Sequence, residues 1–335
     1  MSDLSPNGVD ISMRSLRKTV ATPWIYGHRG ARGEMPENSM TGLVHAMEAG
    51  VRAVEIDVQN SSDGVTVVWH DHNLDPDMVR DPKGDWLTSD ATLIVDISYE
   101  DLRAFDFGAL REGSAPATEF PQQARIDDVR IVALRDVCHW VQPLTDFTLN
   151  IEIKSYADRT DWGDSPIDLA QSVFTLIQRY GLIDRVIVSS FDWRVLSAMR
   201  DMAPNVTCGY LTYLDRPNPP MAPNVIDGSP WLDGLRLCDH DNSLPQAIAE
   251  MGGSVWAPYY EDLTARDLEH AHELGLIVNV WTVNAAKDMQ RMADMGVDGI
   301  ITDYPTMAKA LFEQSRPRTK AVPQREPQER TGGKP

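Results

Sequence analysis

Two carboxylates stand two positions apart in the β-rich run AVEIDV at residues 53–58. Because successive side chains of a β-strand point to opposite faces, Glu55 and Asp57 share one face while the apolar residues share the other. If the apolar face packs against helices, both carboxylates point into the fold, where two unpaired negative charges are very costly. The pair therefore predicts a bound cation.

A third carboxylate follows the same pattern in the run TLNIEI at residues 148–153. Glu152 lies on the polar face of this run, and Lys154 follows one step further toward the strand's end. Three neighbouring carboxylates suit one hard divalent cation, and we expect Mg²⁺ or Ca²⁺, with Mn²⁺ as an alternative. A structural alternative is an internal layer of ion pairs, in which Glu152 pairs with Lys154 and Glu55 with an arginine.

Two histidines are expected beside these acids. His28 ends the β-rich run WIYGH, and His70 lies in the run VTVVWHD. Imidazole is close to half-protonated near neutral pH, so one histidine can remove a nucleophile's proton while the other protonates a leaving oxygen. Arg29 and Lys154 can then hold phosphate oxygens. A competing interpretation makes the two histidines ligands of Zn²⁺ or Mn²⁺ in a hydrolase centre.

Short β-rich runs alternate with helical patterns along most of the chain. Several helical patterns end in Gly, as a helix C-cap often does, and Asn38 or Ser39 can cap the start of the first one. Eight runs in βα order predict an α/β fold, a parallel (β/α)8 TIM barrel, with its functional side chains at the C-terminal ends of the strands. The expected barrel strands are residues 24–28, 53–58, 148–153, 185–190, 206–211, 254–258, 276–283 and 299–303.

The run at residues 65–71 does not belong to this barrel count. It follows the second strand closely, with the hairpin signal Asp63-Gly64 between them, so it must fold back antiparallel. This return brings His70 toward the level of the first two carboxylates. Residues 72–130 are the largest irregular stretch, and we expect a lobe inserted over the barrel mouth, either a lid that affects specificity or a packing element.

The composition excludes several kinds of partner. The formal net charge of −19, from 50 acidic and 31 basic residues, argues against nucleic acid or an anionic membrane surface. No apolar signal segment begins the chain, and no apolar run reaches the roughly 18 residues that a membrane span needs. We therefore expect a cytoplasmic protein with no membrane span. Cys138, Cys208 and Cys238 are odd in number and lack metal-site spacing, which predicts buried free thiols.

Three segments are expected along the chain. Residues 1–22 form a flexible N-terminal arm, residues 23–315 a barrel domain that contains the insertion, and residues 316–335 a disordered tail. The tail has six basic and two acidic residues and too few apolar ones to fold. The oligomeric state is left open. The histidines without acidic company, expected to be structural or at the surface, are His45, His72, His139, His240, His270 and His272.

The ordered motifs resemble those of a known family. The run HRG…PENS…EIDV…DG…VVWHD, followed by NIEIK, VSSF, WTVN and DGIITDYP, is similar to the glycerophosphodiester phosphodiesterases over roughly residues 24–312. The resemblance implies a phospholipase-C-like TIM barrel. It also implies metal-dependent hydrolysis of small glycerophosphodiesters to sn-glycerol 3-phosphate and an alcohol, by acid–base catalysis with two histidines.

The resemblance also assigns roles to residues of this chain. One departure from the family pattern is Ser39, which stands where the family usually has Thr. The stretch between His70 and Asn150, which contains the lobe, has no clear family equivalent, so the alcohol headgroup is left open. The implied site consists of the metal ligands Glu55, Asp57 and Glu152, the catalytic His28 and His70, and the substrate-binding Arg29, Lys154, Glu37, Asn38, Trp281 and, on a weaker match, Phe191.

Two rival interpretations remain at this point. One keeps the enzyme class but changes the substrate to lysophospholipids, glycerophosphoinositol or sugar phosphodiesters; an apolar lip on the lobe at 72–130 would favour lipid and a polar one water-soluble diesters. The other is a binding protein that retains the barrel without turnover. Every expected catalytic position is filled, which argues against the second.

Overall fold

The computed structural model describes residues 22–217 and 221–314. The expected arm at 1–22, apart from Thr22, and the expected tail at 316–335 lie outside the described residues. Among those described, no helix is both long enough and apolar enough to cross a membrane.

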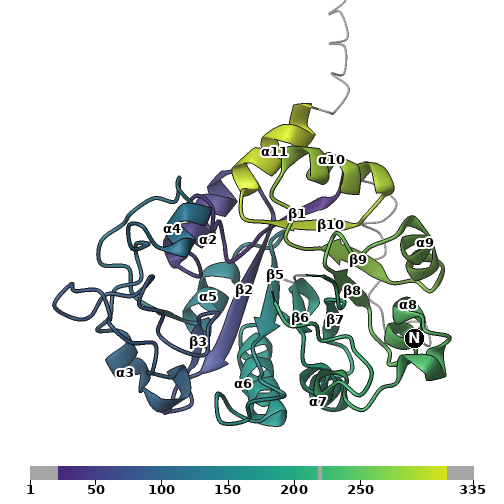
Figure 1. The fold of residues 1–335 in the computed structure, drawn as a ribbon, viewed down its shortest axis with the longest axis horizontal. Helices are drawn as coiled ribbons and strands as arrows, with labels where there is room; N and C mark the ends of the chain where they lie inside the picture. The colour runs from purple at the N-terminus through teal and green to yellow at the C-terminus, as the bar shows by residue number, and fades with distance from the viewer. Residues whose placement is uncertain (1–21, 218–220, 315–335) are drawn as a thin grey trace, which may run out of the picture.

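Parallel strands close into a barrel at the centre of the molecule (Figure 1). Each barrel strand pairs with its neighbour, and the first strand pairs with both the second and the last, so the sheet has no free edge there. The predicted eight-stranded TIM barrel is confirmed within the described residues. Its strands are β1 (Trp24–Gly27), β2 (Ala53–Asn60), β5 (Thr148–Ile153), β6 (Val186–Ser190), β7 (Thr207–Thr212), β8 (Val255–Pro258), β9 (Ile277–Val280) and β10 (Gly299–Thr302).

Strand β2 shows why alternation in the sequence positions the carboxylates. All eight of its residues are buried, because one face packs on the outer hydrophobic core and the other faces the barrel interior. Val54, Ile56 and Val58 belong to that outer core. The register pairs Asp57 with Glu152 of β5, so two of the predicted ligands stand on neighbouring strands at one level.

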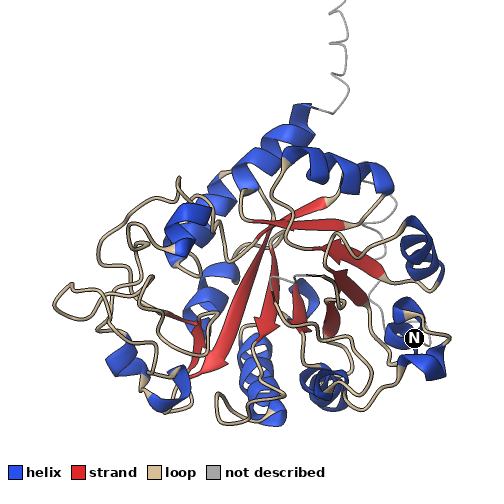
Figure 2. Cartoon of the chain, viewed as in Figure 1, coloured by secondary structure: helices blue, strands red, loops and turns tan. Residues whose placement is uncertain are grey.

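Helices surround the barrel (Figure 2). The predicted capping role of Ser39 is confirmed, since its hydroxyl accepts the backbone N–H of Gly42. The last helix before β10 ends as predicted at Gly296, whose φ of 97° is the left-handed conformation typical of a glycine cap. The helices of the ring are α2 (Met40–Glu48), α5 (Leu134–Val141), α6 (Pro166–Arg179), α7 (Trp193–Met202), α8 (Leu244–Glu250), α9 (Ala265–Glu273), α10 (Ala286–Met295) and α11 (Pro305–Gln314).

The end of β2 continues past the barrel into a short antiparallel extension. Strand β3 (Thr66–Val68) folds back on it as the Asp63-Gly64 signal predicted, with Val58 opposite Val68. Strand β4 (Val132–Ala133), which was not predicted, adds to the other side of β3. His70 therefore leaves β3 in the direction of the barrel.

The insertion at 72–130 has a small hydrophobic core of its own. It contains η1 (Ile94–Asp96), α3 (Tyr99–Leu102) and α4 (Ala115–Glu119), connected by turns. Figure 1 shows α3 and α4 to one side of the barrel. The core that joins the lobe to the β3 extension consists of Val67, Trp69, Leu74, Met78, Val79, Ile94, Leu102, Phe107 and Ile131.

The cysteine prediction is right for two residues and wrong for the third. Cys138 and Cys208 are free and buried, and burial raises the pKa of both thiols to about 12. Cys238 is also free but exposed. It lies in η4 (Leu237–His240), a single turn in the connection from β7 to α8, in which Leu237 and not Cys238 packs against the core.

Candidate active site

Glu55, Asp57 and Glu152 converge inside the barrel. Each offers a carboxylate oxygen, and these oxygens lie within 4.8 Å of one another. All three side chains are buried, Asp57 almost completely. Strand alternation turns Glu55 and Asp57 to the same side of β2, and pairing with β5 adds Glu152 from the next strand.

The donor set fits a hard divalent cation. Glu55 Oε1 and Asp57 Oδ1 are buried and have no hydrogen-bond partner within residues 22–217 and 221–314. Burial, with repulsion from the other two carboxylates, raises the pKa of Glu55 well above its ordinary value, and burial also raises that of Glu152. Unpartnered buried oxygens that crowd one another are the arrangement that a divalent ion with oxygen ligands would stabilise.

Part of the alternative ion-pair layer is also present. Lys154 Nζ lies 2.6 Å from Glu152 Oε1 and 3.7 Å from Asp57 Oδ1. Burial opposes the charge on Lys154, but Glu152 and Asp57 outweigh it and raise the pKa of the ammonium. Glu55 forms no such ion pair with any arginine that the structure describes: its Oε2 accepts the backbone N–H of Arg29, at 2.9 Å. The ionic layer therefore accounts for only some of the acidic charge.

Arg29 is held rigidly at the end of β1. Its backbone is left-handed, with φ of 49°, in the tight turn after His28. Its guanidinium contacts Glu37, with Nη1 2.8 Å from Oε1, and Asp57, with Nε 3.3 Å from Oδ2. Arg29 borders the cavity described below, so a bound anion and these two carboxylates can share its charge.

Glu37 and Asn38 lie behind the cavity wall and do not line it. Glu37 is buried and pairs with Arg32 as well as Arg29, with 2.6 Å between Glu37 Oε2 and Arg32 Nε. Burial alone would raise its pKa, but the two arginines lower it to about 2. Asn38, with φ of 52°, donates to Asp57 Oδ2 at 3.0 Å and accepts the Asp57 N–H at 3.2 Å. Glu37 therefore contacts Arg29 and Asn38 contacts Asp57, although neither Glu37 nor Asn38 lines the cavity.

His28 presents one ring nitrogen to Asp303 and the other to the acid cluster. Its Nδ1 lies 2.6 Å from Asp303 Oδ1, and its Nε2 lies 3.8 Å from Glu55 Oε2. Asp303 in turn accepts a hydrogen bond of 2.6 Å from the Asn284 amide nitrogen. The hydrogen bond from Asn284 to Asp303, together with the one between Asp303 and His28, fixes the orientation of the imidazole.

His70 has the same arrangement with a different acid. Its Nδ1 lies 2.6 Å from Oδ1 of the adjacent Asp71. Burial, together with the positive charges of Arg29 and Lys154, holds the pKa of His70 well below 6.5. His70 is therefore neutral near pH 7, the form that accepts a proton.

Sequence reasoning missed Asp303, Asn284 and Asp71. Asp303 directly follows β10 in the motif GIITD, and Asn284 closes the motif WTVN, so both stood in quoted motifs without an assigned role. Their contact with His28 depends on closure of the barrel, which places the end of β10 beside the end of β1. Asp71 could have been found from its position next to His70.

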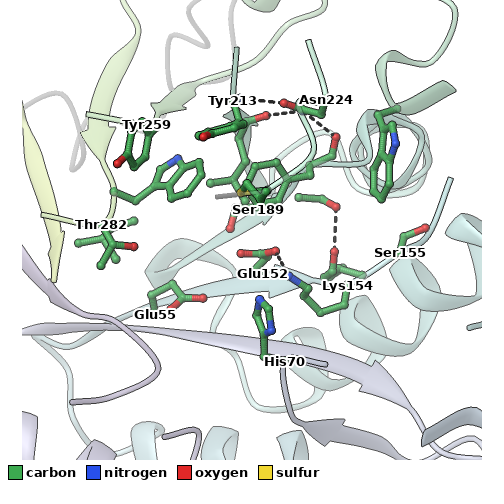
Figure 3. Close-up of a pocket in the computed structure, with 18 of the residues that line it drawn as sticks. Glu55, His70, Glu152, Lys154, Ser155, Ser189, Tyr213, Asn224, Tyr259 and Thr282 are labelled. Atoms are coloured by element: carbon green, nitrogen blue, oxygen red, sulfur yellow. Dashed lines mark hydrogen bonds and ion pairs between the residues drawn. The ribbon is translucent and has the colours of Figure 1, made fainter. Parts of the chain in front are cut away.

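A cavity of about 630 Å³ opens at this end of the barrel and contains the site (Figure 3). Glu55, Glu152, Lys154 and His70 lie on one side of it in that view, and Tyr213 and Tyr259 lie across from them. The two aromatic residues predicted for the site, Phe191 and Trp281, both line the cavity. The predicted site residues that line the cavity are His28, Arg29, Glu55, His70, Glu152, Lys154, Phe191 and Trp281.

The expectation that the lobe at 72–130 covers the mouth is wrong for this cavity. All lobe residues are described, and none lines it. The lobe's small hydrophobic core draws it to β3 at the side of the barrel. The outer walls come instead from residues 155–162 after β5 and 221–231 after β7. The lobe contributes indirectly, through two residues that line the cavity. Its His72 ring stacks on Trp162 with ring centroids 3.7 Å apart, and its Phe120 ring centroid lies 4.4 Å from the Arg32 guanidinium carbon.

Curated relatives match most of this chain over nearly their whole length. A glycerophosphodiester phosphodiesterase of Caldanaerobacter subterraneus subsp. tengcongensis is 30% identical over 281 residues, which cover 84% of this chain and 94% of that protein. A glycerophosphodiester phosphodiesterase of Bacillus altitudinis is 26% identical over 87% of this chain and 99% of that protein.

Solved structures share the fold. A Silicibacter pomeroyi protein provisionally named a glycerophosphoryl diester phosphodiesterase has a TM-score of 0.80 and 35% identity, covering 90% of this chain and 97% of that one. An Oleispira antarctica phosphodiesterase, solved with the product sn-glycerol-3-phosphate, has a TM-score of 0.62 and 20% identity, with coverages of 87% and 97%. A sequence model described as the glycerophosphoryl diester phosphodiesterase family matches residues 28–307. The chain is therefore an enzyme of the glycerophosphoryl diester phosphodiesterase family.

Proposed function

We propose that this phosphodiesterase hydrolyses glycerophosphodiesters to sn-glycerol 3-phosphate and an alcohol, with His28 and His70 as the acid–base pair. The observation that carries the proposal is that both imidazoles line one cavity with Glu55 and Glu152 of the acid cluster, each imidazole with its Nδ1 on an aspartate. Each ring therefore keeps Nε2 for the substrate. The product seen in the Oleispira antarctica relative supports the choice of substrate.

Glu55, Asp57 and Glu152 would hold one divalent cation, Mg²⁺ or Ca²⁺ by the hardness of their oxygens, with Mn²⁺ as an alternative. When bound, such an ion supplies positive charge that offsets the repulsion between the acids and an anionic diester. Arg29 and Lys154, which both line the cavity, bind the phosphate oxygens in this scheme. Glu37 and Asn38 position Arg29 and Asp57.

The proton transfers follow from the two histidines. One imidazole takes the proton of the attacking hydroxyl, and the P–O bond to the alcohol breaks as the other imidazole protonates the departing oxygen. The low pKa of His70 suits the accepting role. If the glycerol 2-hydroxyl attacks, a cyclic phosphate forms first, and water then opens it with the proton roles exchanged. Phe191 and Trp281 line the space next to the phosphate-binding groups and would contact the substrate's carbon atoms.

The expected cytoplasmic location stays part of the proposal. It is supported by the three unpaired cysteines, which a reducing compartment maintains. Fractionation of the native host with an antibody to the chain tests the location.

The net charge of −19 supports a small-molecule substrate over nucleic acid.

The decisive test is an assay on glycerophosphocholine, coupled to detection of sn-glycerol 3-phosphate, with Mg²⁺, Ca²⁺ and Mn²⁺ supplied in turn. His28→Ala and His70→Ala should each lower kcat about 10²- to 10⁴-fold, and a chelator should abolish turnover. His139→Ala is the matched control, because His139 packs against Tyr180 on the outer helices and does not line the cavity. Near-wild-type turnover in either histidine variant or with the chelator would refute the scheme.

A further inference from the structure

Gln59 continues the polar face of β2 one step beyond the acid cluster. Because side chains alternate along a strand, Gln59 lies on the same face as Glu55 and Asp57. Its side chain is buried, and it is not among the residues that line the cavity. The proposed proton transfers and phosphate contacts give it no part, so the presence of a buried amide at this place needs another reason.

The amide nitrogen of Gln59 holds the backbone on both sides of His70. It donates to the carbonyl oxygen of Trp69, at 3.1 Å, and to that of Asp71, at 2.7 Å. A side-chain amide has two N–H donors in one plane, so each carbonyl receives one. The two peptide groups that flank His70 are thereby joined to one planar group, which restricts the backbone dihedral angles of His70.

The strand ladder does not do this work. The β2–β3 pairing ends with Val58 opposite Val68, followed by a bond of 3.0 Å from the Trp69 N–H to the Asp57 carbonyl oxygen. Among the residues that the structure describes, no backbone N–H donates to the carbonyl of Trp69 or Asp71. Without the Gln59 amide, these carbonyls would lose their hydrogen bonds just where His70 enters the cavity wall.

The same contact also places the acid that orients His70. Asp71, whose carbonyl oxygen accepts from Gln59, has its carboxylate Oδ1 2.6 Å from His70 Nδ1. Figure 3 shows His70 on the same side of the cavity as Glu55. Because Glu55 and Gln59 stand on one strand, β2 sets the position of the imidazole relative to the acid cluster.

The other end of the amide is not used in the same way. Gln59 Oε1 is buried and has no hydrogen-bond partner within the described ranges of the chain. A buried polar atom without a partner costs stability, and native proteins contain few of them. An amide that served stability alone would be expected to satisfy both of its ends. Retention of this one indicates that its two N–H donors serve the site.

We propose that Gln59 is a positioning residue for the reaction, which acts through the backbone and the carboxylate partner of His70 and does not touch the substrate. The inference rests on the proposed function and adds a residue to it. Within the described residues, the Gln59 amide makes no hydrogen bond to Arg29 or Lys154, the groups that bind phosphate in the scheme. Its loss should therefore affect proton transfer and leave substrate binding intact.

Gln59→Met tests the proposal, because methionine has nearly the same length and neither N–H donor. Displacement of a reacting group by about 1 Å can cost about 100-fold in rate, so kcat on glycerophosphocholine should fall about 10- to 100-fold. KM should change less than about threefold, since the phosphate-binding groups are unchanged. Gln142→Met is the matched control: Gln142 is exposed, donates to the Tyr180 carbonyl oxygen at 3.4 Å and does not line the cavity.

The same substitution in a His70→Ala background separates positioning from general damage. If Gln59 acts through His70, its loss should lower the remaining kcat less than about twofold once the imidazole is gone. An equal loss of kcat in both backgrounds would overturn the inference, as would wild-type kcat in Gln59→Met alone. Wild-type turnover in His70→Ala would refute the proposed function itself, a result that the other two outcomes do not produce.

Gln59→Asn covers the case in which the methionine variant does not fold. Asparagine keeps an amide inside the fold but is one methylene shorter, so it cannot reach both carbonyls. It should retain a cooperative thermal transition and still lose about tenfold or more in kcat. A folded Gln59→Asn enzyme with wild-type kcat would contradict the positioning role. Loss of the folded state in this variant too would identify the amide as a structural group and would equally overturn the inference.

Discussion

Each histidine of the active site has its Nδ1 on an aspartate, and this contact decides which ring nitrogen is available. Asp303 holds His28 from the neighbouring strand end, and Asp71 holds His70 from the next residue. A carboxylate at this position favours the tautomer that carries its hydrogen on Nδ1, so Nε2 is left free for the proton exchange with substrate that we propose. The two acids are positioning residues in this scheme.

Asp303→Asn tests this positioning role. The substituted amide would retain the shape of the carboxylate but would offer an N–H as well as an oxygen, so the His28 tautomer and orientation would no longer be fixed. We expect kcat to fall about 10- to 100-fold with little change in KM. Asp294→Asn is the control, since Asp294 is exposed and, within the part of the chain that the structure describes, accepts a hydrogen bond only from the Gln290 amide. A variant whose KM rises while kcat is retained would contradict the assignment.

Glu152→Gln tests the metal site without relying on activity. An ion that binds only the folded enzyme stabilises it by about 2.7 kcal/mol at a concentration one hundred times its Kd. Thermal melts with and without Mg²⁺ or Ca²⁺ should therefore show a rise in Tm for the wild type and a much smaller one for the variant. Glu269→Gln on the exposed face of α9 should retain the rise. Equal shifts in all three proteins would exclude Glu152 as a ligand.

At the scale of elements, the turn after β1 determines where His28 and Arg29 point. Gly27 ends the strand, and Gly30, with φ of 86°, donates its N–H to the carbonyl oxygens of Gly27 and Glu55, each at 3.2 Å. The turn is packed so closely that a Cβ built on Gly27 would lie 1.9 Å from the Gly30 carbonyl oxygen. Only glycine fits this position without movement of the backbone.

Gly27→Ala should therefore lower both stability and activity. Relief of the clash must move the turn that carries His28, and overpacking of this kind costs about 1–3 kcal/mol of unfolding free energy. Urea unfolding measures the first effect, and kcat on glycerophosphocholine measures the second. In Gly163→Ala the new Cβ would meet only the Tyr156 ring at an ordinary 3.4 Å, so its stability should change by less than about 0.5 kcal/mol. Wild-type stability in Gly27→Ala would contradict the close packing.

At the scale of the whole molecule, the irregular regions fall into two groups with different roles. The lobe at 72–130 packs its own small core at the side of the barrel. The segments after β5 and β7 form the outer cavity wall. Substrate preference should therefore follow from those two connections, while the lobe contributes to stability through the β3 extension.

Leu102→Ala in the lobe tests that separation. Leu102 is fully buried in the lobe core, so its truncation should cost about 2–5 kcal/mol of unfolding free energy. Its effect on KM for glycerophosphocholine, measured well below the unfolding transition, should be negligible, because no lobe residue lines the cavity. A raised KM in the folded variant would show that the lobe reaches the substrate.

The sequence by itself determined the features that depend on local periodicity. Strand alternation put Glu55, Asp57 and Glu152 on inward faces, the Asp63-Gly64 turn returned β3 antiparallel, and the βα order specified the barrel. These features follow from a few neighbouring residues, because side-chain direction in a strand and the hand of a turn are set by the local backbone.

Only the tertiary structure decided the contacts between distant segments. The pairing of His28 with Asp303 joins residues 275 positions apart and exists because the last strand closes on the first. The place of the lobe depended on which apolar side chains it could bury, and its small core lies against β3 at the barrel's side. The loops after β5 and β7 carry no periodic pattern, so their part in the cavity wall depended on packing across the barrel mouth, which no local rule specifies.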